Sequence, residues 1–168
     1  MAEIRFERKL RVPAELAAQV LGEMLHAIAR QEGPWRGFAL HITLGDLRLP
    51  DVGYVAIPIS LTVERSSQSD AFDITFHAAR LPTAFPDFKG TMGAQPGELG
   101  ESTLYLAGSY SIPMNVFGKL IDGALMPHAA QRSLENFVEE IAAAAQARVD
   151  KREADYARYS YFAGNPVG

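Results

Sequence analysis

The sequence contains no cysteine, no long apolar run and no excess of basic residues. Without cysteine the chain forms no disulfide, zinc–thiolate site or thiol nucleophile, and we expect a reducing, cytoplasmic environment. The apolar runs are shorter than the roughly 20 residues that a membrane-spanning helix needs, and the start, MAEIRFERKLRVP, lacks the apolar core of a signal peptide. The 16 basic and 20 acidic residues do not favour nucleic-acid binding. We therefore expect neither a membrane span nor a nucleic-acid partner.

The residues that are present suit one self-sufficient domain. A chain of 168 residues, 48% of them hydrophobic, has the size and apolar content of a single domain with its own core. We assign that domain to residues 1–150. Residues 151–168 form a C-terminal tail that mixes charged residues with Tyr156, Tyr159, Tyr161 and Phe162, and an aromatic cluster of this kind usually docks on another surface.

The periodicity of apolar residues predicts the order of the secondary structure. Apolar and charged residues alternate from Ile4 to Val12, as in a half-buried strand, and Pro13 then precedes strong helix formers with one apolar stripe. Short runs rich in Val, Ile, Thr and aromatic residues follow, separated by turn-forming residues. A second helical pattern runs from Asn115 to about Asp150, and Pro127 should kink or divide it. Before this second helix, the predicted elements are a strand at 4–12, a helix at 14–31, and strands at 36–48, 52–65, 70–80, 86–95 and 101–112.

This order predicts an α+β fold, with one antiparallel sheet whose single apolar face is covered by a long helix. A strongly curved sheet and one rod rarely fill the space between them completely, so we expect a cavity. Apolar cavities with a few polar groups are the usual binding sites for small molecules.

The segment from Gly108 to Ile141 carries a resemblance to a known superfamily. Its sequence, GSYSIPMNVFGKLIDGALMPHAAQRSLENFVEEI, resembles the last strand, the Pro-containing turn and the two-part final helix of the SRPBCC superfamily. This superfamily includes StAR-related lipid-transfer domains, the birch-pollen-allergen group and polyketide cyclase/dehydrase-like proteins. The resemblance covers about residues 3–147. It implies a helix-grip fold, in which a curved antiparallel sheet of about six strands wraps around a long C-terminal helix and an N-terminal helix lies between the first two strands. The tail after Asp150 has no counterpart in the superfamily.

Arg8 breaks the alternation of the first strand, because it falls on the face that Phe6 and Leu10 occupy. A buried arginine needs a carboxylate or several acceptors, or else it must reach water along its aliphatic stem. Two interpretations stay open. Arg8 either anchors a carboxylate, phosphate or carbonyl of an apolar ligand, or it is a structural residue at a bulge, a register slip or the sheet edge.

The four histidines, His26, His41, His77 and His128, do not by themselves predict a catalytic site, because none has a partner by local spacing. A metal site needs at least three convergent ligands, and no His, Asp and Glu cluster has the required spacing. Motifs for a serine nucleophile, a phosphate loop or a dinucleotide are missing as well. We predict no metal and no cofactor, and we assign no catalytic residue.

The favoured function is binding of a small or medium-sized apolar ligand, lipid-like or aromatic, between the sheet and the C-terminal helix. A buried Tyr110 hydroxyl would want a partner, so Tyr110 or Arg8 would serve as a polar anchor. Two alternatives stay open, a polyketide cyclase/dehydrase-like enzyme acting on an apolar substrate and a protein-interaction module with a filled cavity. The oligomeric state is not predicted. The expected ligand-binding residues are Arg8, Phe38, Phe72, Phe76, Met92, Tyr110, Phe117, Leu120, Ile121 and Leu125.

Overall fold

The computed structural model describes residues 2–43, 53–67, 69–79, 87–111 and 125–164. The order of its elements agrees with the predicted α+β class. The elements are β1 (Ala2–Leu10), α1 (Ala14–Ala29), a short 3-10 helix η1 (Gly33–Trp35), β2 (Ala39–Thr43), β3 (Tyr54–Arg65), β4 (Phe72–Ala78), β5 (Asp87–Pro96), β6 (Ser102–Ser111) and α2 (Leu125–Gly164).

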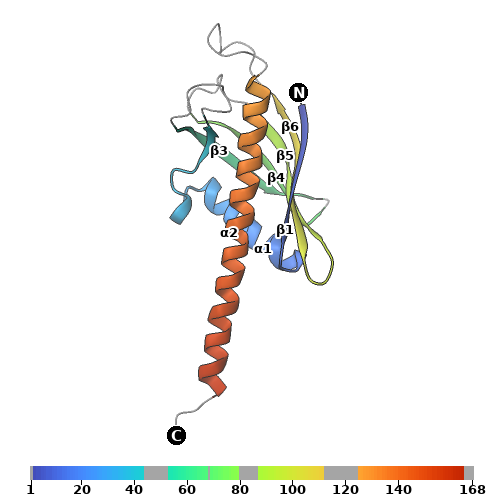
Figure 1. Ribbon diagram of the computed structural model, residues 1–168, viewed down its shortest axis with the longest axis vertical. Coiled ribbons are helices and arrows are strands. Elements are labelled where there is room, and N and C mark those ends of the chain that lie inside the picture. Colours follow the sequence, from blue (N-terminus) through green and yellow to red (C-terminus); the bar gives the residue numbers. More distant parts are fainter. Residues whose placement is uncertain (1, 44–52, 68, 80–86, 112–124, 165–168) are drawn as a thin grey trace.

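The six strands form one antiparallel sheet in the order β1-β6-β5-β4-β3-β2. The sheet curls so far that both of its edge strands, β1 and β2, contact α2, while α1 packs on β3 and β5. Figure 1 shows α2 as a single long rod that crosses the sheet. The helix-grip fold is thereby confirmed.

The period-two alternation decides which side chains enter the core. On β4, Phe72, Ile74, Phe76 and Ala78 are buried, and the residues between them are exposed. The same alternation operates on β6, where Ser102, Leu104, Leu106 and Tyr110 are buried and the residues between them are more exposed. The inner face of the sheet and the apolar stripes of both helices merge into one core, as a sheet with one apolar face requires.

Two glycines shape the concave face near the middle of the sheet. Gly90 on β5 and Gly108 on β6 are direct register partners. A Cβ atom at Gly90 would lie 2.6 Å from Cζ of Phe88, and one at Gly108 would lie 2.8 Å from the same atom. The missing side chains therefore leave room for the Phe88 ring to lie flat on the sheet.

The C-terminal helix differs from the prediction at its end. The expected end near Asp150 is wrong, since α2 continues to Gly164. Residues 151–163 contain neither Gly nor Pro and include several good helix formers. Pro127 is the third residue of the described helix, so the predicted kink or division there depends also on the residues before it. The predicted helical residues 115–124 lie outside the described residues.

Candidate functional site

Five aromatic rings form a continuous series between the sheet and α2. The ring centroids of Trp35 and Phe38 are 5.7 Å apart, and those of Phe38 and Phe137 are 5.9 Å apart. Phe137 contacts Phe76 at 6.0 Å, and Phe76 stacks on Phe88 at 4.9 Å. These separations are typical of favourable aromatic pairs. The series joins two predicted site residues, Phe38 and Phe76, through Phe137 of α2.

Two hydrogen-bond donors, one at each end of this ring series, make no short hydrogen bond. The Trp35 Nε1 atom is buried and has no hydrogen-bond partner within the described part of the chain. The buried Tyr110 lies opposite Phe88 in the β5 to β6 register, and its hydroxyl donates to the Pro127 carbonyl at 3.5 Å, the long limit for such a bond. Leaving a buried donor unpaired costs about 1–3 kcal/mol. Both donors therefore favour an additional acceptor nearby.

Two other predicted residues, Phe72 and Met92, lie under α1 instead. They are register partners on β4 and β5, and Met92 is fully buried. The Phe72 ring packs against the backbone of Gly22 on α1, where a Cβ atom would approach its Cζ to 2.6 Å. The His26 ring meets Phe72 edge-on at a centroid distance of 6.1 Å. The predicted site residues thus divide into a group facing α2 and a group facing α1.

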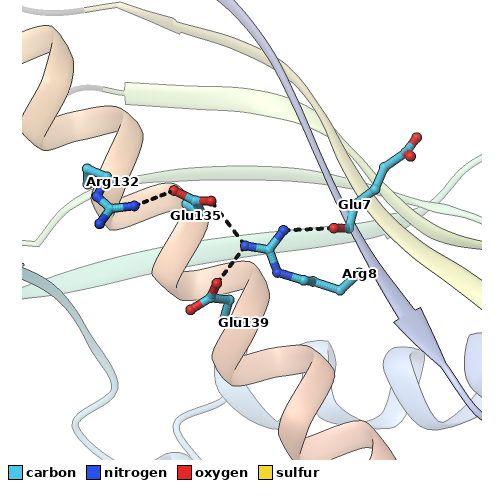
Figure 2. A network of polar contacts seen from close by, with 5 residues as sticks. All are labelled: Glu7, Arg8, Arg132, Glu135 and Glu139. Atoms are coloured by element: carbon cyan, nitrogen blue, oxygen red, sulfur yellow. Dashed lines mark hydrogen bonds and ion pairs between the residues drawn. The ribbon is translucent and has the colours of Figure 1, made fainter.

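Arg8 reaches from β1 to two carboxylates of α2, as Figure 2 shows. Its Nη2 atom lies 3.1 Å from Oε1 of Glu135 and 2.6 Å from Oε1 of Glu139, and its Nη1 atom donates to the backbone carbonyl of Glu7 at 2.8 Å. Glu135 accepts a further bond from Nη1 of Arg132 at 3.0 Å. The protein itself therefore supplies the carboxylates that a half-buried arginine needs.

The same network shifts two pKa values. The hydrogen bond to Glu139 raises the pKa of Arg8 above its ordinary value, with the bond to Glu135 adding to the effect. The hydrogen bonds from Arg8 and from Arg132 lower the pKa of Glu135. Both shifts favour the charged forms, so the link between β1 and α2 is ionic at neutral pH.

The opposite edge of the sheet makes a second polar contact with α2. His41 on β2 places its Nδ1 atom 3.6 Å from Oε1 of Glu140, and both side chains are partly exposed. Its ring also meets Tyr54 edge-on at 4.8 Å. Charged or polar pairs thus connect each edge strand to α2, one at Arg8 and one at His41.

The histidines do not converge. The His26 Nδ1 atom lies 2.7 Å from the Gly22 carbonyl oxygen within α1, while His77 and His128 have exposed side chains on β4 and α2. In the ranges that the structure describes, no three His, Asp or Glu side chains gather as a metal site would require. Among those same ranges, no helix combines the length and the apolar character needed to cross a membrane.

Sequence reasoning missed three members of the ring series. Trp35 lies in the connection between α1 and β2, where periodicity carries no signal. Phe88 shares the alternation parity of Met92 on β5, and Phe137 lies on the apolar stripe of α2, so both had a detectable signal for burial. Of the other predicted residues, Phe117, Leu120 and Ile121 lie outside the described residues, and Leu125 is described only as part of the α2 backbone.

The curled six-stranded sheet gripping a long C-terminal helix is the fold of SRPBCC and START-like proteins. Solved structures share it at low sequence identity. The Zhui aromatase/cyclase from a Streptomyces species matches with a TM-score of 0.57 at 14% identity, over 88% of this chain and 95% of its own. Ara h 8.0201 matches with 0.55 at 8% identity, over 89% and 98%. The Thermus thermophilus protein TTHA0849 matches with 0.53 at 16% identity, over 90% and 99%. No protein-family profile and no curated protein matches the sequence.

Proposed function

We propose that this protein binds a small or medium-sized apolar molecule between the concave face of its sheet and α2. The observation that carries the proposal is the aromatic series from Trp35 to Phe88, which is bordered by the two poorly paired donors of Trp35 and Tyr110. Apolar walls with a few polar groups that orient the ligand are typical of small-molecule sites. One of the similar folds is named an aromatase/cyclase, which is in keeping with an aromatic or polycyclic ligand.

We place the ligand at the Tyr110 end of the sheet. Phe137 lies in the first third of α2 and fills the space between that helix and the sheet, where it contacts both Phe38 and Phe76. The ring series therefore forms the floor of the site, and the Tyr110 hydroxyl lies beyond it, beside the first turn of α2. Phe38, Phe76 and Tyr110 contact the ligand in this arrangement.

Arg8, Phe72 and Met92 shape the site without being its main contacts. Arg8 holds α2 against β1 through its two carboxylate partners, and Phe72 and Met92 seat α1 on the sheet. Phe117, Leu120, Ile121 and Leu125 remain predicted contacts from the sequence.

Binding, rather than acid–base chemistry, is favoured by the groups that the interior contains. Among the described residues, the buried polar or charged ones are Ser102 and Ser133, and Tyr110 adds a buried phenol. The Ser133 hydroxyl already donates a hydrogen bond to the Ala130 carbonyl, at 2.8 Å. General acid–base catalysis most often uses His, Asp, Glu or Lys side chains, and none of these is buried among the described residues.

A matched pair of ligands tests the proposal. Fluorene and fluorenone have the same ring frame, and only fluorenone carries a carbonyl acceptor. We expect both to bind with one molecule per chain by native mass spectrometry and calorimetry. Tyr110→Phe should weaken fluorenone binding about fivefold, the value of one neutral hydrogen bond, and leave fluorene binding unchanged.

Tyr105→Phe serves as the control, since Tyr105 is on the same strand as Tyr110 but its place in the alternation puts it on the other face of the sheet. It should alter neither affinity. If neither molecule binds, and no member of a lipid and sterol panel binds either, the result would count against an apolar ligand site. Equal losses for fluorene and fluorenone in Tyr110→Phe would count against the polar role of Tyr110.

A further inference from the structure

The C-terminal part of α2 projects from the domain and carries exposed aromatic rings, as the red end of the helix in Figure 1 shows. Residues 151–159 are exposed, and Tyr156 and Tyr159 retain 78% and 79% of their surface. We call residues 151–164 the helical extension, and at 1.5 Å per residue it adds about 20 Å to α2. Helices in proteins owe most of their stability to the packing of an apolar face. Within residues 151–159, whose side chains are described, the extension therefore lacks the packing that stabilises the rest of α2.

The two exposed tyrosines continue a stripe that α2 already buries inside the domain. Val149 is 1% exposed. Three residues further along the helix, Arg152 reaches Glu23 of α1, with a distance of 2.6 Å from Nη2 to Oε2. Steps of three and four residues give the heptad spacing with which two helices pack side by side. The stripe consists of Val138, Ala142, Ala145, Val149, Arg152, Tyr156 and Tyr159. Its exposed continuation has the spacing required for packing against another helix.

The charges of the extension favour an identical partner. The extension contains two acidic side chains, Glu153 and Asp155, and three basic ones, Lys151, Arg152 and Arg158. A helix that binds an anionic membrane surface is rich in Lys and Arg on its polar face, and this segment has no such excess. With mixed charges and a formal excess of only one basic side chain, the extension is compatible with its own copy, because two copies repel each other only weakly.

We propose that the helical extension pairs with the extension of a second copy of this chain, in antiparallel orientation about a two-fold axis near Tyr156 and Tyr159. The stripe before Val149 is covered by its own domain, so a parallel partner would bring its domain into the same space. In the antiparallel pair, Tyr156 of each chain packs against Tyr159 of the other, as a closed two-fold interface requires. The overlap is short, and we expect a dissociation constant of about 1–100 µM.

Sedimentation velocity across a concentration series tests the pairing. The wild-type chain should shift from 18.3 kDa toward twice that mass as its concentration rises to about 100 µM. The double variant Tyr156→Glu/Tyr159→Glu should stay monomeric, because each ring is replaced by a like charge. Ala154→Glu, on the other face of the extension, is the matched control and should dimerise like the wild type. A monomeric wild type, or a double variant that still dimerises, overturns the proposal.

The absence of cysteine in the natural sequence allows the orientation to be tested by cross-linking. Arg152→Cys chains mixed with Ala163→Cys chains should form a disulfide-linked heterodimer under mild oxidation. Cross-linking of Arg152→Cys to itself, without the mixed product, would show a parallel pair and contradict the antiparallel arrangement. Flotation with vesicles of phosphatidylcholine and phosphatidylserine tests whether the extension binds a membrane surface instead. We expect no binding, and binding that Tyr156→Glu/Tyr159→Glu abolishes would overturn the proposal in favour of a membrane surface.

Discussion

The Nη2 atom of Arg8 on β1 lies 2.6 Å from Oε1 of Glu139 on α2, although 131 positions separate the two residues in the chain. With Glu135 as a second acceptor, this contact ties one edge of the curled sheet to the helix that it encloses. His41 and Glu140 make a looser contact at the other edge. The position of α2 over the aromatic series therefore depends on polar contacts at both edges as well as on apolar packing between them.

Replacement of Arg8 should destabilise the fold. Arg8→Gln removes the charge that Glu135 and Glu139 share and leaves two carboxylates facing each other, so we expect a loss of about 1–2 kcal/mol in the free energy of unfolding. Arg5→Gln is the control on the exposed face of the same strand, where the partner Glu7 is also about half exposed. It should change stability by less than about 0.5 kcal/mol. Urea unfolding of both variants at neutral pH makes the comparison, and equal losses would contradict a special role for Arg8.

The same link should make stability depend on pH. The pKa of Glu135 is lowered in the folded protein by Arg8 and Arg132, so its ionised form stabilises the fold above the pKa it has when unfolded. That contribution is lost as the pH falls through the lowered folded value. Wild type should therefore be more stable than Glu135→Gln at neutral pH, and the difference should shrink in acid, below the ordinary glutamate value of 4.5. A difference that stays constant from neutral pH into this acidic range would argue against the ionic link.

Phe137 should contribute more to stability than any exposed aromatic residue. It is 1% exposed and contacts both Phe38 and Phe76, so Phe137→Ala should cost about 3–5 kcal/mol. Phe137→Leu keeps most of the apolar volume and should cost less. Leu99→Ala, at a fully exposed position, is the control and should be nearly neutral in chemical denaturation. A loss below about 1 kcal/mol for Phe137→Ala would mean that the ring is not packed as described.

Gly108 should not tolerate a side chain. A Cβ atom there would lie 2.5 Å from the Lys89 carbonyl oxygen and 2.6 Å from Cα of Gly90, so Gly108→Ala should cost about 1–3 kcal/mol through displaced backbone. Because these two contacts are with backbone atoms, Phe88→Leu in the same chain should not restore the lost stability. Full recovery in the double variant would show instead that the Phe88 ring alone restricts position 108.

The fold was largely predictable because its signals are local. Alternation along β4 placed Phe72 and Phe76 on the inner face, and the same parity placed Arg8 there. The partners of Arg8 were not predictable, since Glu135 and Glu139 are distant in sequence and carry no motif. Phe72 was predicted on the correct face, but only tertiary packing shows that it faces α1.

Two further features were not predicted, for different reasons. The unpaired Trp35 donor belongs to a connecting segment without periodicity, so no pattern predicted its burial. The helical extension was interpreted as a tail because its charges and aromatics interrupt the apolar pattern, although helix propensity allowed it to continue.

Trp35 is the single tryptophan of the chain, and it lies at one end of the aromatic series, which makes it a built-in reporter of the proposed site. Energy transfer from Trp35 to the anionic, amphiphilic fluorophore 1-anilinonaphthalene-8-sulfonate, whose aromatic rings bind apolar sites, followed by competition with fluorenone, tests ligand binding beside that series. We expect saturable quenching of Trp35 with one fluorophore per chain, reversed by fluorenone and weakened by Phe137→Leu. Fluorophore binding without quenching of Trp35, or quenching that fluorenone does not reverse, would contradict an apolar site between the sheet and α2.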